Sequence, residues 1–441
     1  MEEITAVSSA TPAMRQYLEA KRQHPDAILF FRMGDFYEMF YEDALVAARA
    51  LDLTLTSRTK DDQGGGIPMC GVPHQAADAY IARLVRKGFR VAICEQVEDP
   101  RKARGLVRRE VVRVVSPGTL VDAGYLEARE PAFLMAIAPG DGPAWGVALL
   151  DLSTGEFSAA EYRAAAGRAA LADELAVLRP RELLVPAGAG APGGWLPAVR
   201  PSNGADEGPR VTEADPWTFE HEAARRALLD QLGVQSLAAF GLERHPLAVR
   251  AAGALVQYLR ETQKAQLAHV RSIVFRTGGD ALVIDPTTLR HLEVVEGAGG
   301  GRAGSLLEVL DRTVTAMGSR LLRSWLLRPP AVIERIQDRL DAVEELAFRA
   351  TERAKLREVF RHVQDLERLV ARAALGTAGP RELAAIGTSL DAVPRARAIA
   401  GGCQAPLVRS LAAALDDLAE LRARIAATLV DDPPATARDG G

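Results

Sequence analysis

The chain has 441 residues, a formal net charge of -4 at pH 7, 48% hydrophobic residues and 25% charged residues. This balance excludes a wholly disordered chain, and the slightly acidic total excludes a protein that holds nucleic acid by bulk positive charge. Because Cys70, Cys94 and Cys403 show no metal-site spacing and no apolar run approaches the roughly 18 residues of a membrane helix, we expect a cytoplasmic protein without disulfides or a membrane span.

The length fits roughly three domains of about 150 residues each, and the first of them mixes helix and strand. Residues 14–23 are typical of a short helix, and residues 27–33 form an apolar run of strand length that ends at Gly34. From Phe36 to Leu51, apolar residues return at helical spacing. We therefore predict a strand, a turn and a helix that begins near Phe36.

Further elements of the first domain follow a glycine-rich loop at residues 64–66. Residues 76–87 are typical of a second helix, which Gly88 would close. Residues 90–95 and 111–115 are expected to be strands.

Basic residues are concentrated in the same part of the chain. From Arg83 to Arg113, ten basic residues stand against four acidic ones, a local balance of 10 - 4 = +6. A run of this kind is usually a solvated surface, and contact with nucleic-acid phosphates is the alternative.

A second α/β unit is expected next. Its strand-like and helix-like runs are residues 132–137, 145–151 and 156–161 (strands), 164–178 (helix) and 182–186 (strand). The stretch 187–208, rich in Gly, Pro and Ala, is expected to be a loop.

Beyond about Phe219 the periodicity is helical almost throughout. The segments that show it are residues 228–232, 247–267, 306–327, 333–348, 356–374 and 407–429. A short hairpin between Ile273 and Ile284, around Gly278 and Gly279, is the expected interruption. The predicted fold class is therefore multidomain α/β plus all-α.

Three groups of motifs follow one another along the chain. The first is FFRMGDFYEMFYEDA with IPMCGVPHQAADAY and VAICEQVEDP, the second is RVVSPGT, and the third begins with GSLLEVLDRTVTAMGSRLLRSWLLRP. With these motifs the chain resembles the N-terminal half of the MutS family of DNA mismatch-recognition proteins. The resemblance implies a mixed α/β mismatch-binding domain at residues 1–119 and an RNase H-like α/β connector domain at 128–245. A helical core and lever domain at 246–441 would follow, truncated before the clamp and the ATPase domain.

The resemblance assigns mismatch recognition to Phe36 and Glu38. It implies that Phe36 wedges beside the mismatched base and kinks the duplex, and that Glu38 forms a hydrogen bond to that base. Unstacking costs about a few kcal/mol per base step, and a mismatch lowers the cost because its stacking is already impaired. Met33, Tyr37 and Arg58 flank this tip as further candidate DNA contacts, although packing or a solvated surface explains each of them equally well.

A purely structural alternative exists for the same segment. Asp35 and Glu38 match an Asp-x-x-Glu capping pattern, in which Phe36 would be a buried residue of the first helical turn. Without the family resemblance, this alternative is favoured. The sequence departs from the family at His74-Gln75, where an aromatic residue or His followed by His is usual, so a backbone contact there stays open.

Two segments bear on enzymatic activity. GAGGGRAGS at residues 297–305 is spaced almost like a phosphate-binding loop, but no Lys precedes Ser305, so we expect a plain loop. Asp151 on a strand, with Glu156, is the basis of the alternative function, an RNase H-like metal-dependent nuclease. Two-metal catalysis needs more convergent carboxylates than this unit offers. We expect no catalytic residue, metal or cofactor in this chain, and no enzyme activity of its own.

The resemblance also implies partners. Full-length family members bind ATP and Mg²⁺ in a C-terminal domain, form a homodimer, convert mismatch recognition into an ATP-driven sliding clamp and recruit MutL. For this chain the expected partner is mismatched double-stranded DNA, with MutL as a partner in the repair pathway. We expect it in the cytoplasm, associated with the nucleoid and without contact to a membrane.

Overall fold

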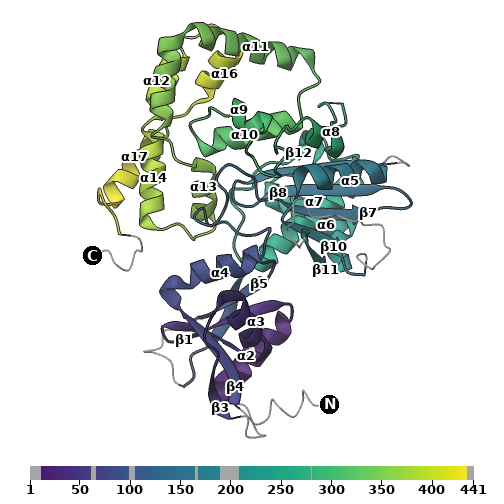
Figure 1. Cartoon of the computed structure of the whole chain (residues 1–441), viewed down its shortest axis with the longest axis vertical. Coiled ribbons are helices and arrows are strands. Elements are labelled where there is room, and N and C mark those ends of the chain that lie inside the picture. The colour runs from purple at the N-terminus through teal and green to yellow at the C-terminus, as the bar shows by residue number, and fades with distance from the viewer. Residues whose placement is uncertain are drawn as a thin grey trace.

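The computed structural model describes residues 11–60, 66–98, 105–163, 167–188, 208–279 and 281–434. Within these residues the strands form two six-stranded sheets, and most of the remaining regular structure is helical. Figure 1 shows three parts in chain order: a small sheet domain, a second sheet domain and an open arch of helices that leads to the C-terminus. The predicted class, multidomain α/β plus all-α, is confirmed.

The first sheet has the strand order β3-β4-β2-β1-β5-β6. Its strands are β1 (Ala27–Met33), β2 (Phe36–Phe40), β3 (Thr56–Lys60), β4 (Gly66–Pro73), β5 (Arg90–Gln96) and β6 (Arg109–Val115). The helices around it are α2 (Pro12–Gln23), α3 (Tyr41–Leu51), the 3-10 helix η1 (His74–Ala76) and α4 (Ala77–Arg86). β1 runs parallel to β5, and the neighbouring described pairs are antiparallel.

Helices cover both faces of this sheet. One face carries Phe30 and Met39 and packs against α3 and α4. The other face carries Leu29 and Phe31 and packs against Tyr17 of α2. Because both faces are buried, β1 is apolar at successive positions and does not alternate with polar residues.

The segment Phe36–Phe40 is a strand, so the prediction of a helix that begins near Phe36 is wrong. β2 pairs with β1 on one side and with β4 on the other, and α3 begins only at Tyr41. Both faces of β2 meet apolar clusters, which gives the strand apolar residues at spacings that continue the helical pattern of α3. The Asp-x-x-Glu helix cap proposed as an alternative is therefore excluded.

The second sheet has the strand order β11-β10-β7-β8-β9-β12. Its strands are β7 (Leu134–Pro139), β8 (Trp145–Asp151), β9 (Glu156–Tyr162), β10 (Glu182–Pro186), β11 (Arg210–Ala214) and β12 (Val274–Phe275). The helices of this part are α5 (Gly167–Leu178), η2 (Pro216–Phe219), α6 (His221–Leu232), η3 (Ala238–Phe240) and α7 (Pro246–Gln263). α5 packs on one face and α7 on the other, which gives three layers (Figure 1).

Helix α7 belongs to the second sheet by its contacts, although the resemblance implied a helical domain from residue 246 onward. The helix is apolar on nearly every side and is buried against β7, β8 and β9, as a helix of that composition requires. A Cβ at Gly146 of β8 would lie 1.9 Å from the carbonyl oxygen of Leu247, so glycine is needed for this close approach. The second sheet domain therefore includes α7 and continues past residue 245.

The hairpin predicted between Ile273 and Ile284 is wrong. β12 pairs in parallel with β9, and Ala281 forms an isolated antiparallel bridge with Pro330. The residues on both sides of the expected turn therefore pair with distant segments, β9 and Pro330, and not with each other.

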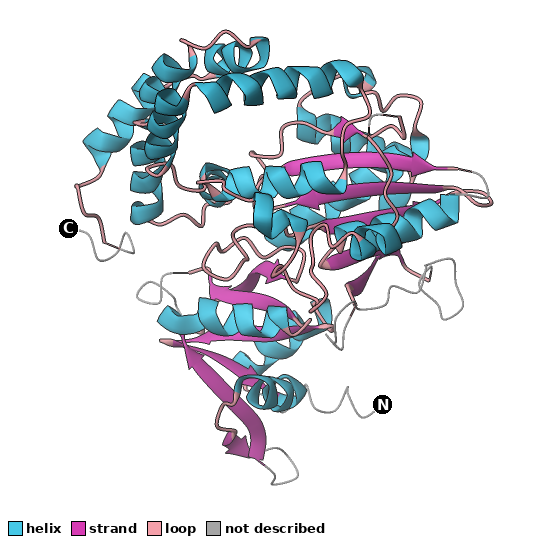
Figure 2. Ribbon diagram, turned by 45° about the horizontal axis from the view of Figure 1, so that its top comes forward, coloured by secondary structure: helices cyan, strands magenta, loops and turns pink. Residues whose placement is uncertain are grey.

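The last part of the described chain is an arch of helices (Figure 2). These helices are α8 (Pro286–His291), α9 (Leu306–Leu310), α10 (Ala316–Leu327), α11 (Ile333–Phe348), α12 (Ala350–Phe360), α13 (Leu366–Ala374), α14 (Pro380–Leu390), α15 (Val393–Ala400), α16 (Pro406–Ala414) and α17 (Ala419–Thr428). The helices expected at residues 306–327, 356–374 and 407–429 are each divided in two. In the first two, Thr315 and Asp365 cap the start of a new helix inside the expected segment. No helix in the described ranges is long and apolar enough to cross a membrane.

A buried carboxylate joins the first sheet domain to the second. Glu182 of β10 is fully buried and accepts hydrogen bonds from the Ser116 hydroxyl and from the Gly118 N–H, the latter at 3.0 Å. It also accepts from the hydroxyls of Thr212 (2.7 Å) and Tyr258 (2.8 Å). The turn that closes the first domain is therefore fixed to a strand and a helix of the second.

Candidate nucleic-acid interface

The β1–β2 hairpin ends in a turn of two residues, Gly34 and Asp35, because Met33 pairs with Phe36. Gly34 has a φ of 61°, as the first central residue of a type II′ turn requires, and glycine adopts it without a side-chain clash. The backbone N–H of His74, directly after β4, donates to the Asp35 carbonyl at 2.8 Å. The tip is therefore held by the pairing of β1 with β2 and by a hydrogen bond from the residue that follows β4.

Phe36 is the first residue of β2 at this tip, and the residue is 47% exposed. Phe40 lies on the same face of the same strand but is 6% exposed, because it packs edge-on against Tyr17 with ring centroids 5.1 Å apart. The inner end of this face is thus covered by α2, and the outer end presents a free aromatic ring. Such a ring can stack on another planar group.

Glu38 lies on β2 between these two phenylalanines and shares their face of the sheet. It is 8% exposed, and its register partners are Phe31 on β1 and Gly71 on β4. A Cβ at Gly71 would lie 3.3 Å from the Tyr37 carbonyl oxygen and 3.6 Å from Cγ of Glu38, so Gly71 lies directly beside the Glu38 side chain. One face of the tip therefore offers an apolar ring and, two residues further in, a carboxylate.

The structure places the other predicted contacts differently. Tyr37 points to the opposite face and is 5% exposed, whereas Met33 pairs with Phe36 across the hairpin, shares its face and is half-buried against the cluster around Tyr17. Arg58 lies on β3, and its side chain is outside the described residues. His74 packs on Tyr37 with ring centroids 5.5 Å apart, whereas Gln75 is exposed.

Two polar residues that were not predicted gather behind the tip. The Tyr37 hydroxyl donates to Glu95 of β5, and Nη1 of Arg32 lies 3.9 Å from Oε1 of Glu95. Burial, followed by the hydrogen bond to Glu95, raises the pKa of Tyr37 well above its usual range, so its hydroxyl remains a donor. The sequence does contain a clue, since Arg32 and Glu95 are opposite charges that end two apolar strands.

Much of the basic run from Arg83 to Arg113 is engaged inside the first domain. Arg83 and Lys87 donate to carbonyls at the end of α3, at 3.2 Å and 2.6 Å. Arg113 is partly buried, and this burial lowers the pKa of its guanidinium. Further members hold carbonyls or a carboxylate: Arg86 with Tyr125, Arg90 with Asp26, and Arg109 with Arg32. Arg108 is exposed and pairs with Glu110, and residues 101–104 of the run lie outside the described residues.

Asp151 does not resemble a metal ligand in its surroundings. Its side chain is fully buried, one oxygen accepts from the Ala132 N–H at 2.8 Å, and the other accepts from the N–H and hydroxyl of Ser153 at 2.9 Å and 2.6 Å. Glu156 lies opposite on β9 and is exposed. In the part of the chain that the structure describes, no three His, Cys, Asp or Glu residues are placed to hold a metal ion. The nuclease alternative has no support here.

The glycine-rich segment at residues 297–305 is a loop, as predicted. The Gly297 N–H donates to the Gly301 carbonyl at 2.8 Å. Ser305 caps α9, accepting from the Glu308 N–H at 3.1 Å. The serine hydroxyl is thus used within the fold.

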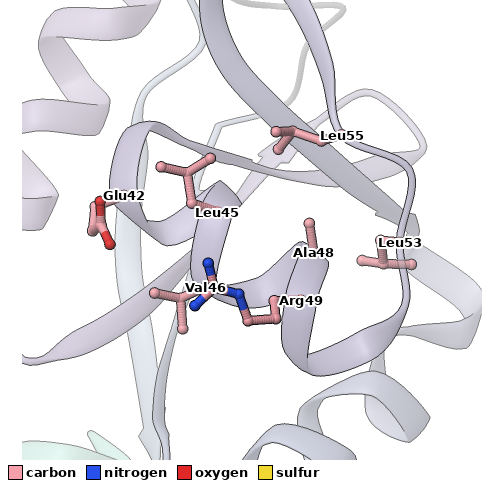
Figure 3. A pocket seen from close by; sticks show the side chains of 7 residues that line it. All are labelled: Glu42, Leu45, Val46, Ala48, Arg49, Leu53 and Leu55. Atoms are coloured by element: carbon pink, nitrogen blue, oxygen red, sulfur yellow. The ribbon is translucent and has the colours of Figure 1, made fainter.

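A surface hollow of about 410 Å³ lies beside α3 (Figure 3). Its lining residues are Glu42, Leu45, Val46, Ala48, Arg49, Leu53 and Leu55. Because α3 covers the sheet face opposite to that of Phe36, this hollow is a separate surface from the tip.

Comparisons with known proteins agree with this architecture. Models described as MutS domain I, MutS domain II and MutS domain III match residues 11–124, 132–271 and 287–441. The second match extends past α7, in keeping with the packing of that helix on the second sheet. The three matches follow one another without overlap and together cover most of the chain.

Individual relatives lead to the same family. The chain is 46% identical over 437 residues to the DNA mismatch repair protein MutS of Myxococcus xanthus (strain DK1622), an alignment that covers 99% of this chain and 48% of that protein. It is 44% identical over 435 residues to the protein of the same name from Symbiobacterium thermophilum, with 98% and 49% covered. The chain belongs to the MutS family. It spans about half the length of the relatives it matches.

Proposed function

We propose that this chain recognises mismatched base pairs in duplex DNA and acts in mismatch repair. The observation that carries the proposal is the exposed ring of Phe36, with Glu38 on the same face of β2. Support also comes from relatives that are named DNA mismatch repair proteins, although each is about twice as long as this chain.

Phe36 acts as a wedge in this proposal. An apolar ring inserted from the minor groove unstacks a base step and kinks the duplex, at a cost of about a few kcal/mol per step. The cost is smaller at a mismatch, because its pairing and stacking are already impaired. Discrimination therefore arises from how easily the duplex deforms, and no particular base sequence has to be recognised.

Glu38 adds a penalty against matched duplex. A carboxylate accepts a hydrogen bond from a base N–H, or donates to a base nitrogen when protonated. Correctly paired bases use these groups with each other, so the carboxylate would face them desolvated and without compensation. The same group therefore favours a mispaired base and opposes a paired one.

The test is a titration of the 441-residue chain with two duplexes that differ in one base, at one fixed salt concentration. Phe36→Ala is expected to weaken mismatch binding by about 1 to 3 kcal/mol, the scale of one aromatic-base stack, while weak matched-duplex binding persists through phosphate contacts. Glu38→Ala is expected to hold or raise matched-duplex binding while the preference falls.

A control variant removes an exposed phenylalanine elsewhere. Phe348, at the end of α11, is 83% exposed, and Phe348→Ala should change neither duplex affinity. A folded Phe36→Ala protein that keeps its full mismatch preference would contradict the proposed function.

We further propose that the chain has no ATPase activity of its own. Its sequence has no Gly-x-x-x-x-Gly-Lys-Ser/Thr loop to cradle phosphates, and magnesium-dependent ATP turnover by the purified chain would refute this. ATP and Mg²⁺ binding, sliding-clamp formation, a homodimer and recruitment of MutL would involve other parts of a longer protein of the relatives' size. Association with the nucleoid would follow from binding to duplex DNA.

A further inference from the structure

Behind the hairpin tip, polar side chains from three strands and one turn meet on the face opposite to Phe36. We call this cluster the tip platform; its members are Arg32, Tyr37, His74 and Glu95. We infer that the tip platform positions Phe36, holding the hairpin rigid so that the ring enters a mismatch without first ordering its own backbone. The inference rests on the proposed mismatch-binding function.

The platform residues follow buried apolar residues on the same face of the sheet. Along β1, Phe30 is followed on the same face by Arg32, and along β5, Ile93 is followed by Glu95. Tyr37 is the register partner of Arg32 on β2. The face is thus apolar within the domain and becomes polar at the tip, where the strands leave the cover of the core.

One hydrogen bond spans three strands of the sheet. The Tyr37 hydroxyl starts from β2 and reaches Glu95 of β5, although β1 lies between these strands. Arg32 on the intervening strand has its guanidinium carbon 5.6 Å from the Tyr37 ring centroid. Nε2 of His74 lies 3.6 Å from the same Glu95 carboxylate. A lateral displacement of β2 would disturb both contacts that Tyr37 makes, the one with Glu95 and the one with Arg32.

The platform is also tied to the turn itself. Arg32 donates through Nε to the carbonyl of Gly34, and the backbone N–H of His74 donates to the carbonyl of Asp35 at 2.8 Å. Nε of Arg109 on β6 donates to the Arg32 carbonyl at 2.6 Å. Both turn residues are therefore connected to the platform, one by a side chain and one by the backbone.

Rigidity has a direct effect on binding. Ordering one residue's backbone costs about 1 to 2 kcal/mol, and an isolated hairpin is marginal in water. A turn that is already ordered avoids this cost at the moment of insertion, so more of the stacking energy appears as affinity. The ring can stay exposed because the support is provided on the other face of the strand.

Tyr37→Phe is the sharpest test, because it removes one hydroxyl and keeps the ring. Hydrogen exchange of the amides of residues 34–37 should become about tenfold faster, as expected for the loss of a hydrogen bond to a charged group. Mismatch affinity should fall about tenfold, while matched-duplex affinity stays unchanged. Glu95→Gln, which keeps the shape and loses the charge, should act in the same direction with a smaller change.

A matched control exists in the same domain. Tyr17 is another buried tyrosine, and its hydroxyl donates to Asp43 and to the Phe40 carbonyl, both at 3.0 Å, at the α2 end of the sheet. Tyr17→Phe should lower the melting temperature to a similar extent as Tyr37→Phe but leave tip exchange and mismatch preference unchanged.

A double-mutant cycle separates positioning from general destabilisation. In a Phe36→Ala background, Tyr37→Phe should cause no further loss of mismatch affinity, because the platform acts only through Phe36. The inference would be overturned if Tyr37→Phe lowered mismatch affinity equally in the Phe36→Ala background. It would also be overturned if Tyr37→Phe left the amide exchange of residues 34–37 unchanged, or if Tyr17→Phe altered that exchange and the mismatch preference to the same extent. If Phe36→Ala alone keeps the mismatch preference, the proposed function fails instead, whatever the exchange rates show.

Discussion

Two β-hairpins of this molecule combine a glycine with a positive φ and a nearby carboxylate, yet they use these residues in opposite ways. In the β1–β2 hairpin, Gly34 leads into an exposed Phe36, and a Cβ added at the glycine would meet nothing within 4 Å. In the β8–β9 hairpin, Gly155 lies under the His269 backbone, and the Asp151 carboxylate is turned inward onto three donors. Residue type alone therefore does not decide whether the side chains of a turn are accessible. Burial and hydrogen-bond saturation by the protein's own groups do.

The largest expected effect is at the saturated turn. Asp151→Ala leaves the Ala132 N–H and the Ser153 N–H and hydroxyl without their acceptor, and each buried orphan costs about 1 to 3 kcal/mol, so we expect a loss of about 3 kcal/mol or more of unfolding free energy. Asp151→Asn keeps one acceptor oxygen and should lose less. Urea unfolding measures the stability of both variants. An unchanged midpoint for Asp151→Ala would contradict the view that the hydrogen bonds of Asp151 stabilise the β8–β9 turn.

Gly155→Ala should have the next largest effect. The residue has a φ of 81°, and an added Cβ would lie 2.9 Å from the His269 carbonyl oxygen. The left-handed conformation strains an alanine, and the added Cβ crowds the His269 backbone. Together these effects predict a loss of about 2 to 3 kcal/mol of unfolding free energy. Thermal unfolding at fixed pH tests this value, and a loss no larger than that of Gly34→Ala would remove the distinction between a covered and an open turn.

Gly34→Ala should cost about 1 kcal/mol, since only the left-handed conformation is penalised and nothing lies within 4 Å of the added atom. Gly142 is a matched control with a φ of 69° and equally open surroundings, so Gly142→Ala should cost the same. Of the two variants, only Gly34→Ala should reduce mismatch preference. Equal binding by both variants would argue that tip geometry is irrelevant to recognition.

Phe36→Ala should have the smallest effect on stability, within about 0.5 kcal/mol, because the ring is largely outside the core. Phe40→Ala, on the same face of the same strand, should cost about 3 to 5 kcal/mol, because Phe40 is 6% exposed. Melting curves of the two variants provide the comparison. Similar losses would mean that Phe36 is a packing residue after all.

Parts of the fold follow from local pattern alone. The strands Trp145–Asp151 and Glu182–Pro186 have the expected bounds, because each is an apolar run closed by turn residues. The helix Ile333–Phe348 likewise has the expected bounds. Their bounds can be recognised from the local sequence, although their packing involves residues far along the chain.

Other features depend on distant contacts that no local pattern contains. Phe36 to Phe40 looks helical in sequence because α3 follows directly and both faces of β2 are covered. α7 looks like part of a helical domain until the second sheet is seen beneath it. Phe36 and Glu38 were found through the family motif, whereas the bond from Tyr37 to Glu95 joins residues 58 positions apart. Only the fold brings that pair together.

The shared carboxylate at the domain junction limits how this protein can be dissected. A cut after residue 119 would leave the Ser116 and Gly118 donors on one piece and Glu182 on the other. The second piece would then bury a carboxylate that keeps its hydrogen bonds from Thr212 and Tyr258 but has lost those from Ser116 and Gly118. Transplanting the first domain from a relative would succeed only if its closing turn matched this acceptor. The first two domains are separate in sequence, but this buried carboxylate connects them in the structure.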